Sequence, residues 1–433
     1  MKKILTASSN ENVIATVKNV CNIYSSFFNT DIISETDEII RYIDYELPEI
    51  KVLDFTSKDI DCKKILDEIN KDTWLHYGGV IAVCENRKQV NEVEEFKDSS
   101  ILTIQTVDDF VSHFIRILRI LWQNQKFLFN RGMWEELSGE ECGTFVFGND
   151  AMDMQFYTKF LVNYLYSTNR ISNDDRFNLE LTFNELLTNA LEHGNLEISN
   201  EEKTTWLMEG NDMIDLIRQR SKEPLYKDRK IRISYMIQKN TSKFAIKDDG
   251  KGFDWRKAQE KKADENELHG RGIAVSRTLV KDLIYNDKGN EVAFIINNLQ
   301  NQSSAVPGVM HTFETLQYQD RQVVVKEGDQ SNDLFFIVSG SFAVYAGNKL
   351  TTVLSPNDLF IGEMAFLLND RRTATVICIG ECRLIKIPKK DFLLLIRKNP
   401  HYGIFLSKML AQRLVRQTRQ SVDLKKALET AEA

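Results

Sequence analysis

The spacing of hydrophobic residues changes twice along this chain, which constrains it to fold as several domains. Up to about residue 125, short β-branched runs alternate with amphipathic segments of helical period. From about residue 140, two long helical patterns precede strand-like segments near 230–248 and 291–297. After the small, polar segment 299–309, short strands follow one another closely between glycines. The length of 433 residues is also that of about three domains.

The composition narrows the classes of function. Hydrophobic residues make up 42% of the chain, which is enough for packed cores. The net charge of −7 argues against direct binding of nucleic acid, which needs clustered positive charge. Neither a signal peptide nor an apolar run of membrane-spanning length is present in the sequence, so we expect a cytoplasmic protein without membrane contact. The scattered cysteines form no CxxC pair, which predicts free thiols, including Cys378 and Cys382.

Residues 1–125 have the rhythm of a doubly wound α/β domain with a parallel sheet. They resemble the receiver domains of response regulators, and Asp54, which ends the segment IKVLDF, matches the phosphate-accepting aspartate of that family. The family's metal-binding acidic pair is replaced by Ala7-Ser8-Ser9. The resemblance therefore implies a receiver-like domain without receiver chemistry, a pseudo-receiver used for docking or dimerisation. In the structural alternative, Asp54 is an ordinary aspartate that caps a loop.

Residues 140–298 contain three segments with candidate chemistry. In ELLTNALEHGN, Glu185, Asn189 and His193 are spaced four apart, so they are predicted to share one helix face. A carboxylate beside a carboxamide can place a base next to an oxygen ligand of Mg²⁺, although a solvated polar face gives the same pattern. In IKDDGKGFDW, Asp248 ends a predicted strand and can accept a hydrogen bond from an exocyclic amine.

The glycines of this region are predicted to form nucleotide-binding loops. Gly250 and Gly252 follow Asp248, and their lack of a side chain lets a flat ring approach the backbone. Gly270 and Gly272 precede an apolar-periodic helix, so backbone amides would face a bound phosphate. Each of these patterns is weak evidence when it stands alone.

The order and spacing of the three segments resemble the N, G1 and G2 boxes of the Bergerat-fold (GHKL) ATPases, especially the anti-sigma-factor serine kinases. The resemblance implies an α/β sandwich that binds ATP, with Asn189 as the Mg²⁺ ligand and Asp248 as the adenine acceptor. It also implies that Gly250, Gly252, Gly270 and Gly272 form the nucleotide loops and that Glu185 is the general base. An extra charged segment, roughly 197–228, departs from the family pattern and is expected to be a lid or a partner contact.

Residues 313–433, after a linker at 299–312, are predicted to form a β-roll (jelly roll) with a C-terminal helix from about residue 391. A turn at Gly362 offers backbone amides, Glu363 can accept from ribose hydroxyls, and Arg372 can pair with a phosphate. These residues, with Thr373, resemble the phosphate-binding cassette of cyclic-nucleotide-binding domains. The resemblance implies a bound cyclic nucleotide, with cAMP preferred to cGMP; the alternative is a relic that binds nothing.

The C-terminal helix is too short for an added DNA-reading module. Its basic residues are expected to form a solvated face: Lys408, Arg413, Arg416 and Arg419.

Together these features predict a cytoplasmic signalling kinase regulated by a cyclic nucleotide. Its expected substrate is a STAS-type anti-anti-sigma protein, with a sigma factor as the other candidate partner and a homodimer as a further expectation. A non-catalytic adaptor that senses ATP and a cyclic nucleotide remains the alternative. A histidine kinase would need a phosphoacceptor, and His113 lacks the acidic residue and proline that follow such a histidine.

Overall fold

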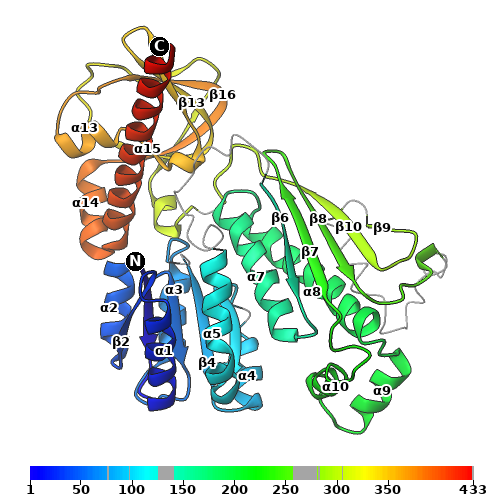
Figure 1. Cartoon of the computed structure of the whole chain (residues 1–433). Helices are drawn as coiled ribbons and strands as arrows, with labels where there is room; N and C mark the ends of the chain where they lie inside the picture. Colours follow the sequence, from blue (N-terminus) through cyan, green and yellow to red (C-terminus); the bar gives the residue numbers. More distant parts are fainter. Residues whose placement is uncertain are drawn as a thin grey trace. The chain divides into compact units, whose positions relative to one another are not determined.

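The computed structural model describes residues 1–75, 78–96, 98–124, 141–256, 280, 283–304 and 306–431 (Figure 1). The chain forms two compact units. The first consists of Met1–Glu136, Ser167–Asn169 and Asn301–Ala433, and the second of Leu137–Tyr166 and Arg170–Gln300. Within the described ranges, no helix is both long and apolar enough to cross a membrane.

The N-terminal part of the first unit is a five-stranded parallel sheet with the strand order β2-β1-β3-β4-β5. This is the order of flavodoxin-like doubly wound domains, and it confirms the predicted parallel sheet. The strands are β1 (Lys2–Ala7), β2 (Phe28–Ile33), β3 (Ile50–Asp54), β4 (Gly79–Cys84) and β5 (Ile101–Thr106). The helices between and after them are α1 (Glu11–Ile23), α2 (Thr36–Glu46), α3 (Cys62–Lys71), α4 (Arg87–Glu94) and α5 (Val107–Gln123).

Local sequence explains where these elements begin. Strands β3 and β4 are buried along their whole length, as their continuous apolar runs require in a sheet covered on both faces. The side chains of Asn10, Asp61, Asn86 and Thr106 each accept a hydrogen bond from a backbone amide in the first turn of α1, α3, α4 and α5. The chain therefore enters four of the five helices through a capping side chain.

The C-terminal part of the first unit is a β-roll. Its strands are β11 (Glu314–Tyr318), β12 (Val323–Val325), β13 (Leu334–Ala346), β14 (Lys349–Leu354), β15 (Phe360–Ile361) and β16 (Thr375–Ile387). The two long strands, β13 and β16, pair antiparallel at its centre. Cys378 and Cys382 form a disulfide within β16, so the prediction of free thiols was wrong for this pair. Gly380, with φ +72°, makes the bend between them.

Three helices complete the roll: α13 (Glu363–Leu368), α14 (Lys389–Lys398) and α15 (His401–Ala431). The single closing helix predicted from about residue 391 is therefore two helices. Pro400 separates them, because a proline has no amide hydrogen with which to continue α14. One hydrophobic cluster contains residues of both the parallel sheet domain and the roll, among them Ile39, Trp74, Phe336 and Tyr402.

The second unit is an antiparallel sheet with the order β6-β7-β8-β10-β9, covered on one face by helices (Figure 1). Its strands are β6 (Glu141–Phe147), β7 (Ile231–Ile237), β8 (Thr241–Asp248), β9 (Ile284–Tyr285) and β10 (Glu291–Asn297). Its helices are α7 (Ala151–Ser167), α8 (Asn173–Asn189), a π-helical turn η1 (Ala190–Asn195), α9 (Asn200–Met208) and α10 (Met213–Arg220). Phe183 of α8 contacts Phe244 and Phe294 of the sheet, which fixes α8 over β8 and β10.

Candidate nucleotide sites

Helix α8 carries the first predicted nucleotide residues. Ser172 and Asp175 form a capping box that sets the start of the helix. Its apolar face packs on the sheet, and Glu185 and Asn189 lie half-buried on α8, one turn apart. The amide nitrogen of Asn189 lies 3.5 Å from a carboxylate oxygen of Glu185. The predicted juxtaposition of these two side chains is therefore present.

His193 lies in η1, which directly follows α8. The chain changes from α-helix to π-helix at Ala190, which alters the angular spacing of the residues that follow. The Nδ1 atom of His193 lies 2.7 Å from the carbonyl oxygen of Ile198. His193 thus holds the loop after η1, and its place on one face with Glu185 and Asn189 stays a prediction.

Asp248 ends β8 and is buried, with 8% of its surface exposed. Its carboxylate accepts a hydrogen bond from the amide of Gly250, at 2.8 Å. Burial raises the pKa of Asp248 to about 6, although the Gly250 amide and the charge of Lys288 oppose the shift. A Cβ atom on Gly194 would lie 2.5 Å from Cγ of Asp248, so the end of η1 can approach this carboxyl only as glycine.

Of the four glycines predicted to form nucleotide loops, Gly250 and Gly252 lie within the described residues. Gly250 lies directly against the carbonyl group of Gly194, so the N-box segment and the turn after β8 meet there. Gly252, with φ +78°, lies against the backbone of Lys288. Gly270 and Gly272 lie outside the described residues, so their predicted role in phosphate binding stays a prediction.

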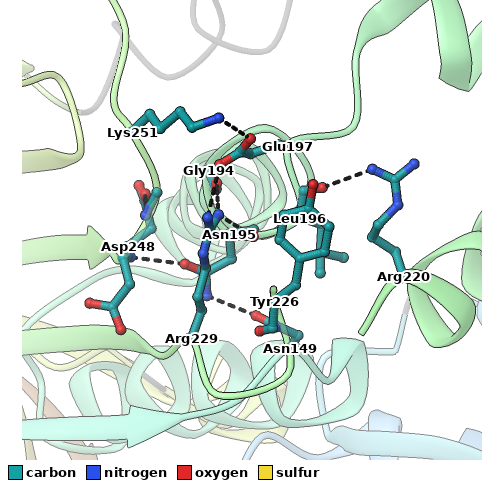
Figure 2. Close-up of polar contacts among 12 residues, drawn as sticks. Asn149, Gly194, Asn195, Leu196, Glu197, Arg220, Tyr226, Arg229, Asp248 and Lys251 are labelled. Atoms are coloured by element: carbon teal, nitrogen blue, oxygen red, sulfur yellow. Dashed lines mark hydrogen bonds and ion pairs between the residues drawn. The ribbon is translucent and has the colours of Figure 1, made fainter. Parts of the chain in front are cut away.

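A group of polar residues that no sequence motif predicted joins these segments (Figure 2). Asn195 is completely buried; its side chain accepts from the amide of Asp249 at 2.9 Å and donates to Asn149 at 2.8 Å. Arg229 donates to the carbonyl group of Asn195 at 2.8 Å and to the carboxylate of Glu197 at 2.9 Å. Asn195 and Arg229 therefore hold the turn that follows Asp248 against the end of η1.

The segment 197–228, predicted as a lid or a partner contact, forms α9 and α10. Ion pairs hold it against η1 and the turn after β8. Lys203 of α9 pairs with Glu192 of η1 at 2.7 Å. Glu197 accepts from Lys251 at 2.7 Å as well as from Arg229 (Figure 2). These bonds to Lys251 and Arg229 outweigh the effect of burial and lower the pKa of Glu197. The charged run 227–230, which contains Arg229 two positions before β7, was the sequence signal available for this network.

The β-roll holds the second candidate site. Arg372 is 3% exposed, and its guanidinium donates to the carbonyl groups of Gly362 and Asp333 at 3.2 and 2.7 Å and to the hydroxyl of Ser331 at 2.9 Å. Burial lowers the pKa of Arg372, against the opposing charges of Asp333 and Glu363. No carboxylate among the described residues forms an ion pair with it. The carboxylate of Asp333, one of its neighbours, pairs with Lys386. A buried cation bonded only to neutral groups suits an anionic ligand.

Glu363 and Thr373 differ in their surroundings. Thr373, next to Arg372, is exposed, and Gly362, with φ +91°, is the residue directly before α13. The buried carboxylate of Glu363 forms an ion pair with Arg413 of α15. Arg413 also donates to the carbonyl groups of Asp358 and Phe360, at 2.8 and 3.2 Å. The prediction of a solvated basic face on the C-terminal helix was therefore wrong for Arg413.

Asp54 of the parallel sheet domain has no exposed surface. Its carboxylate accepts from the hydroxyls of Ser8, Thr56 and Ser57 at 2.6, 2.7 and 2.9 Å and from the amide of Thr56 at 3.0 Å. Both oxygens are thus occupied by hydrogen bonds that fix the loop after β3. This arrangement is that of a loop-capping aspartate.

Comparison with known proteins identifies two of the domains. Residues 315–399 match the family "Cyclic nucleotide-binding domain", and residues 154–296 match the family "Histidine kinase-like ATPase domain". The chain therefore contains a cyclic nucleotide-binding domain and a histidine-kinase-like ATPase domain, which confirms both predictions at this level.

Individual relatives match over shorter ranges. The cyclic AMP receptor protein of Thermus thermophilus is 30% identical over 107 residues, which are 24% of this chain and 49% of the relative. The regulatory subunit of cAMP-dependent protein kinase from Dictyostelium discoideum is 26% identical over 132 residues, 28% of this chain and 38% of the relative. The chain thus spans about half or less of these two relatives. The crystal structure of Thermus thermophilus catabolite activator protein is 25% identical, with a TM-score of 0.23, over 28% of this chain and 56% of that one.

Proposed function

We propose that this protein is a cyclic-nucleotide-regulated kinase that transfers phosphate from ATP to a serine or threonine of a STAS-type antagonist protein. The observation that carries the proposal is the pair on α8, where the side chain of Asn189 lies 3.5 Å from the carboxylate of Glu185. A base held next to a carboxamide whose oxygen can bind Mg²⁺ supports phosphoryl transfer to a hydroxyl.

Each residue of the ATP site has a separate role in this proposal. ATP supplies the phosphoryl group, and the side-chain oxygen of Asn189 holds the Mg²⁺ ion that accompanies it. Asp248 accepts a hydrogen bond from the adenine amine, in a cradle that a Cβ atom on Gly194 would fill. Glu185 accepts the proton of the substrate hydroxyl.

The regulatory ligand in the proposal is cAMP. The buried Arg372 lacks a carboxylate partner among the described residues, which supports a cyclic phosphate as its counter-charge. Glu363 would bond the ribose. The N-terminal domain is proposed to be receiver-like in fold only, and the three hydroxyls around the carboxylate of Asp54 support a structural role for that residue.

The experiment is incubation of the full chain with labelled ATP, Mg²⁺ and candidate STAS proteins, with and without cAMP. We expect acid-stable label on a serine or threonine of the partner. We also expect the rate of its incorporation to depend on cAMP. Binding of ATP and cAMP without any transfer would favour the non-catalytic adaptor. A complex with a sigma factor in place of a STAS protein would change the proposed partner.

A further inference from the structure

The parallel sheet domain and the β-roll share a buried aromatic contact. Trp74, in the turn after α3, is 2% exposed. Its ring centroid lies 5.0–6.1 Å from those of four aromatic residues of the roll and its last helix: Phe336, Phe360, Tyr402 and Phe405. Phe360 belongs to β15, which leads directly into Gly362 and Glu363. Trp74 therefore packs against both the strand that leads to the proposed ribose-binding residue, Glu363, and the first turns of α15.

A polar cluster fastens the start of α15 to the same surface. His401 is 2% exposed, and its two ring nitrogens lie 2.7 Å from a carboxylate oxygen of Asp44 and 3.0 Å from one of Asp72. The hydroxyl of Tyr402 also donates to Asp72, whose other oxygen accepts from the amide of Trp74 at 2.8 Å. An imidazole between two carboxylates is held as the doubly protonated cation. Both carboxylates belong to the parallel sheet domain.

Further along α15, Arg413 reaches the cassette. Arg413 lies twelve positions after His401 in the same helix, about 18 Å along its axis. Arg413 pairs with Glu363 and donates to the carbonyl group of Phe360 at 3.2 Å. A ribose that bonds to Glu363 has to displace Arg413 or share the carboxylate with it. A continuous helix thus connects the anchor at His401 to a group that competes for the ligand.

We propose that the parallel sheet domain restrains cyclic-nucleotide binding by holding α15 in the position where Arg413 occupies Glu363. The inference rests on the cyclic-nucleotide part of the proposed function. The contact surface consists of Trp74, Asp44 and Asp72, and its partner is the start of α15. Because a ligand shifts a conformational equilibrium only by its differential affinity for the two states, an anchor that stabilises the occupied position lowers ligand affinity.

The test is calorimetric titration of the full chain with cAMP and, separately, with cGMP. His401→Gln and Trp74→Ala should each tighten binding by about tenfold, within the usual range for coupled sites. Arg413→Ala should tighten it as well, and the double variant H401Q/R413A should gain no more than R413A alone, because both changes release the same restraint. His311→Gln and Trp122→Phe are matched controls, since both side chains are exposed, and they should leave affinity unchanged.

Circular dichroism and the unfolding midpoint establish that each variant is folded. If H401Q does not fold, Asp44→Asn provides a milder change, because the side chain of Asp44 is 25% exposed. Unchanged or weaker binding in folded anchor variants would overturn the inference while the proposed function stands. Weaker binding in R413A would mean that Arg413 orients Glu363 for the ribose, which also overturns it. Failure of the wild type to bind either nucleotide would overturn both.

Discussion

Arg413 and Glu363 form an ion pair although fifty positions separate them in the sequence. The pair joins the last helix of the chain to the residue that would bond a ribose. Arg372, the phosphate-binding candidate of the same site, instead donates to two carbonyl groups and a hydroxyl. The two charged residues of the cassette thus differ: the carboxylate has a partner of opposite charge, and the guanidinium has none among the described residues.

Replacing Arg372 by alanine should cost about 2–5 kcal/mol of cAMP binding, the usual loss when one partner of a buried charge pair is removed. Titration calorimetry measures the change. Arg372→Lys should restore only part of the affinity, because an ammonium group cannot bond a phosphate in the bidentate manner of a guanidinium. Full affinity in the alanine variant would place the anion elsewhere. Arg371→Ala is the matched control, since the neighbouring arginine is exposed.

Replacing Asn189 by alanine should abolish Mg²⁺-dependent ATP binding, because it removes the proposed oxygen ligand of Mg²⁺ from α8. Calorimetry with ATP in the presence and absence of Mg²⁺ isolates the metal-dependent part. The exposed Asn200 on α9 provides the control, and Asn200→Ala should bind normally. Equal ATP affinity of the Asn189 variant and the wild type in Mg²⁺ would remove this helix from the ATP site.

The substitution Glu185→Gln should leave ATP binding intact and slow transfer to a STAS protein by a factor of about 10²–10⁴, the usual contribution of a positioned base. Single-turnover transfer of labelled phosphate measures it. Glu201→Gln changes an exposed carboxylate on α9 and should have no effect. Identical transfer rates in the Glu185 variant and the wild type would assign Glu185 a structural role.

The raised pKa of Asp248, about 6, predicts a pH dependence of ATP binding. Burial favours the protonated form, so the folded protein holds this proton up to about pH 6 and the carboxylate predominates above it. Since the ionised group is the stronger acceptor for the adenine amine, affinity should fall as the pH drops from about 7 to about 5. Protonation of ATP itself affects the wild type and Asp248→Asn equally. The difference in ATP affinity between the two proteins therefore isolates the effect of protonating Asp248. A difference that is constant with pH would contradict the prediction.

His401 should make the stability of the first unit sensitive to alkaline pH. Burial alone would lower the pKa of His401, but the hydrogen bonds to Asp44 and Asp72 outweigh it and raise the pKa above 6.5. A raised histidine pKa stabilises the folded state fully below the unfolded pKa, and this stabilisation is lost as the pH rises through the folded value. The unfolding midpoint of the wild type should therefore exceed that of His401→Gln most at about pH 6 and least at about pH 9. A difference between the two unfolding midpoints that grows as the pH rises would contradict the prediction.

Sequence periodicity predicted the parallel sheet, α7, α8 and the β-roll, because the alternation of apolar residues is a local property. The pair Glu185 and Asn189 was predictable for the same reason. The contact of His193 with Ile198 was not predictable, because the π-helical turn at Ala190 departs from the α-helical period. The disulfide between Cys378 and Cys382 depends on a bend inside one strand, which no cysteine motif indicates.

The other errors and omissions concern contacts between distant segments. Helical periodicity assigns Arg413 to a solvated face, but Glu363 and the carbonyl group of Phe360 determine where its guanidinium lies. Arg229 lies 34 positions from Asn195, whose carbonyl group it bonds, and 329 positions separate His401 from Asp72. Such partners depend on how whole elements pack, which one sequence does not reveal.

The first unit is assembled from both ends of the chain, Met1–Glu136 and Asn301–Ala433, so most of the ATPase domain is inserted into it. During synthesis on the ribosome, the surface around Trp74 emerges hundreds of residues before the helix that covers it. The apolar surface of the N-terminal domain is therefore exposed to solvent while the ATPase domain is synthesised. A nascent chain that stops before His401 would keep that face uncovered, and such chains should be bound by chaperones or degraded.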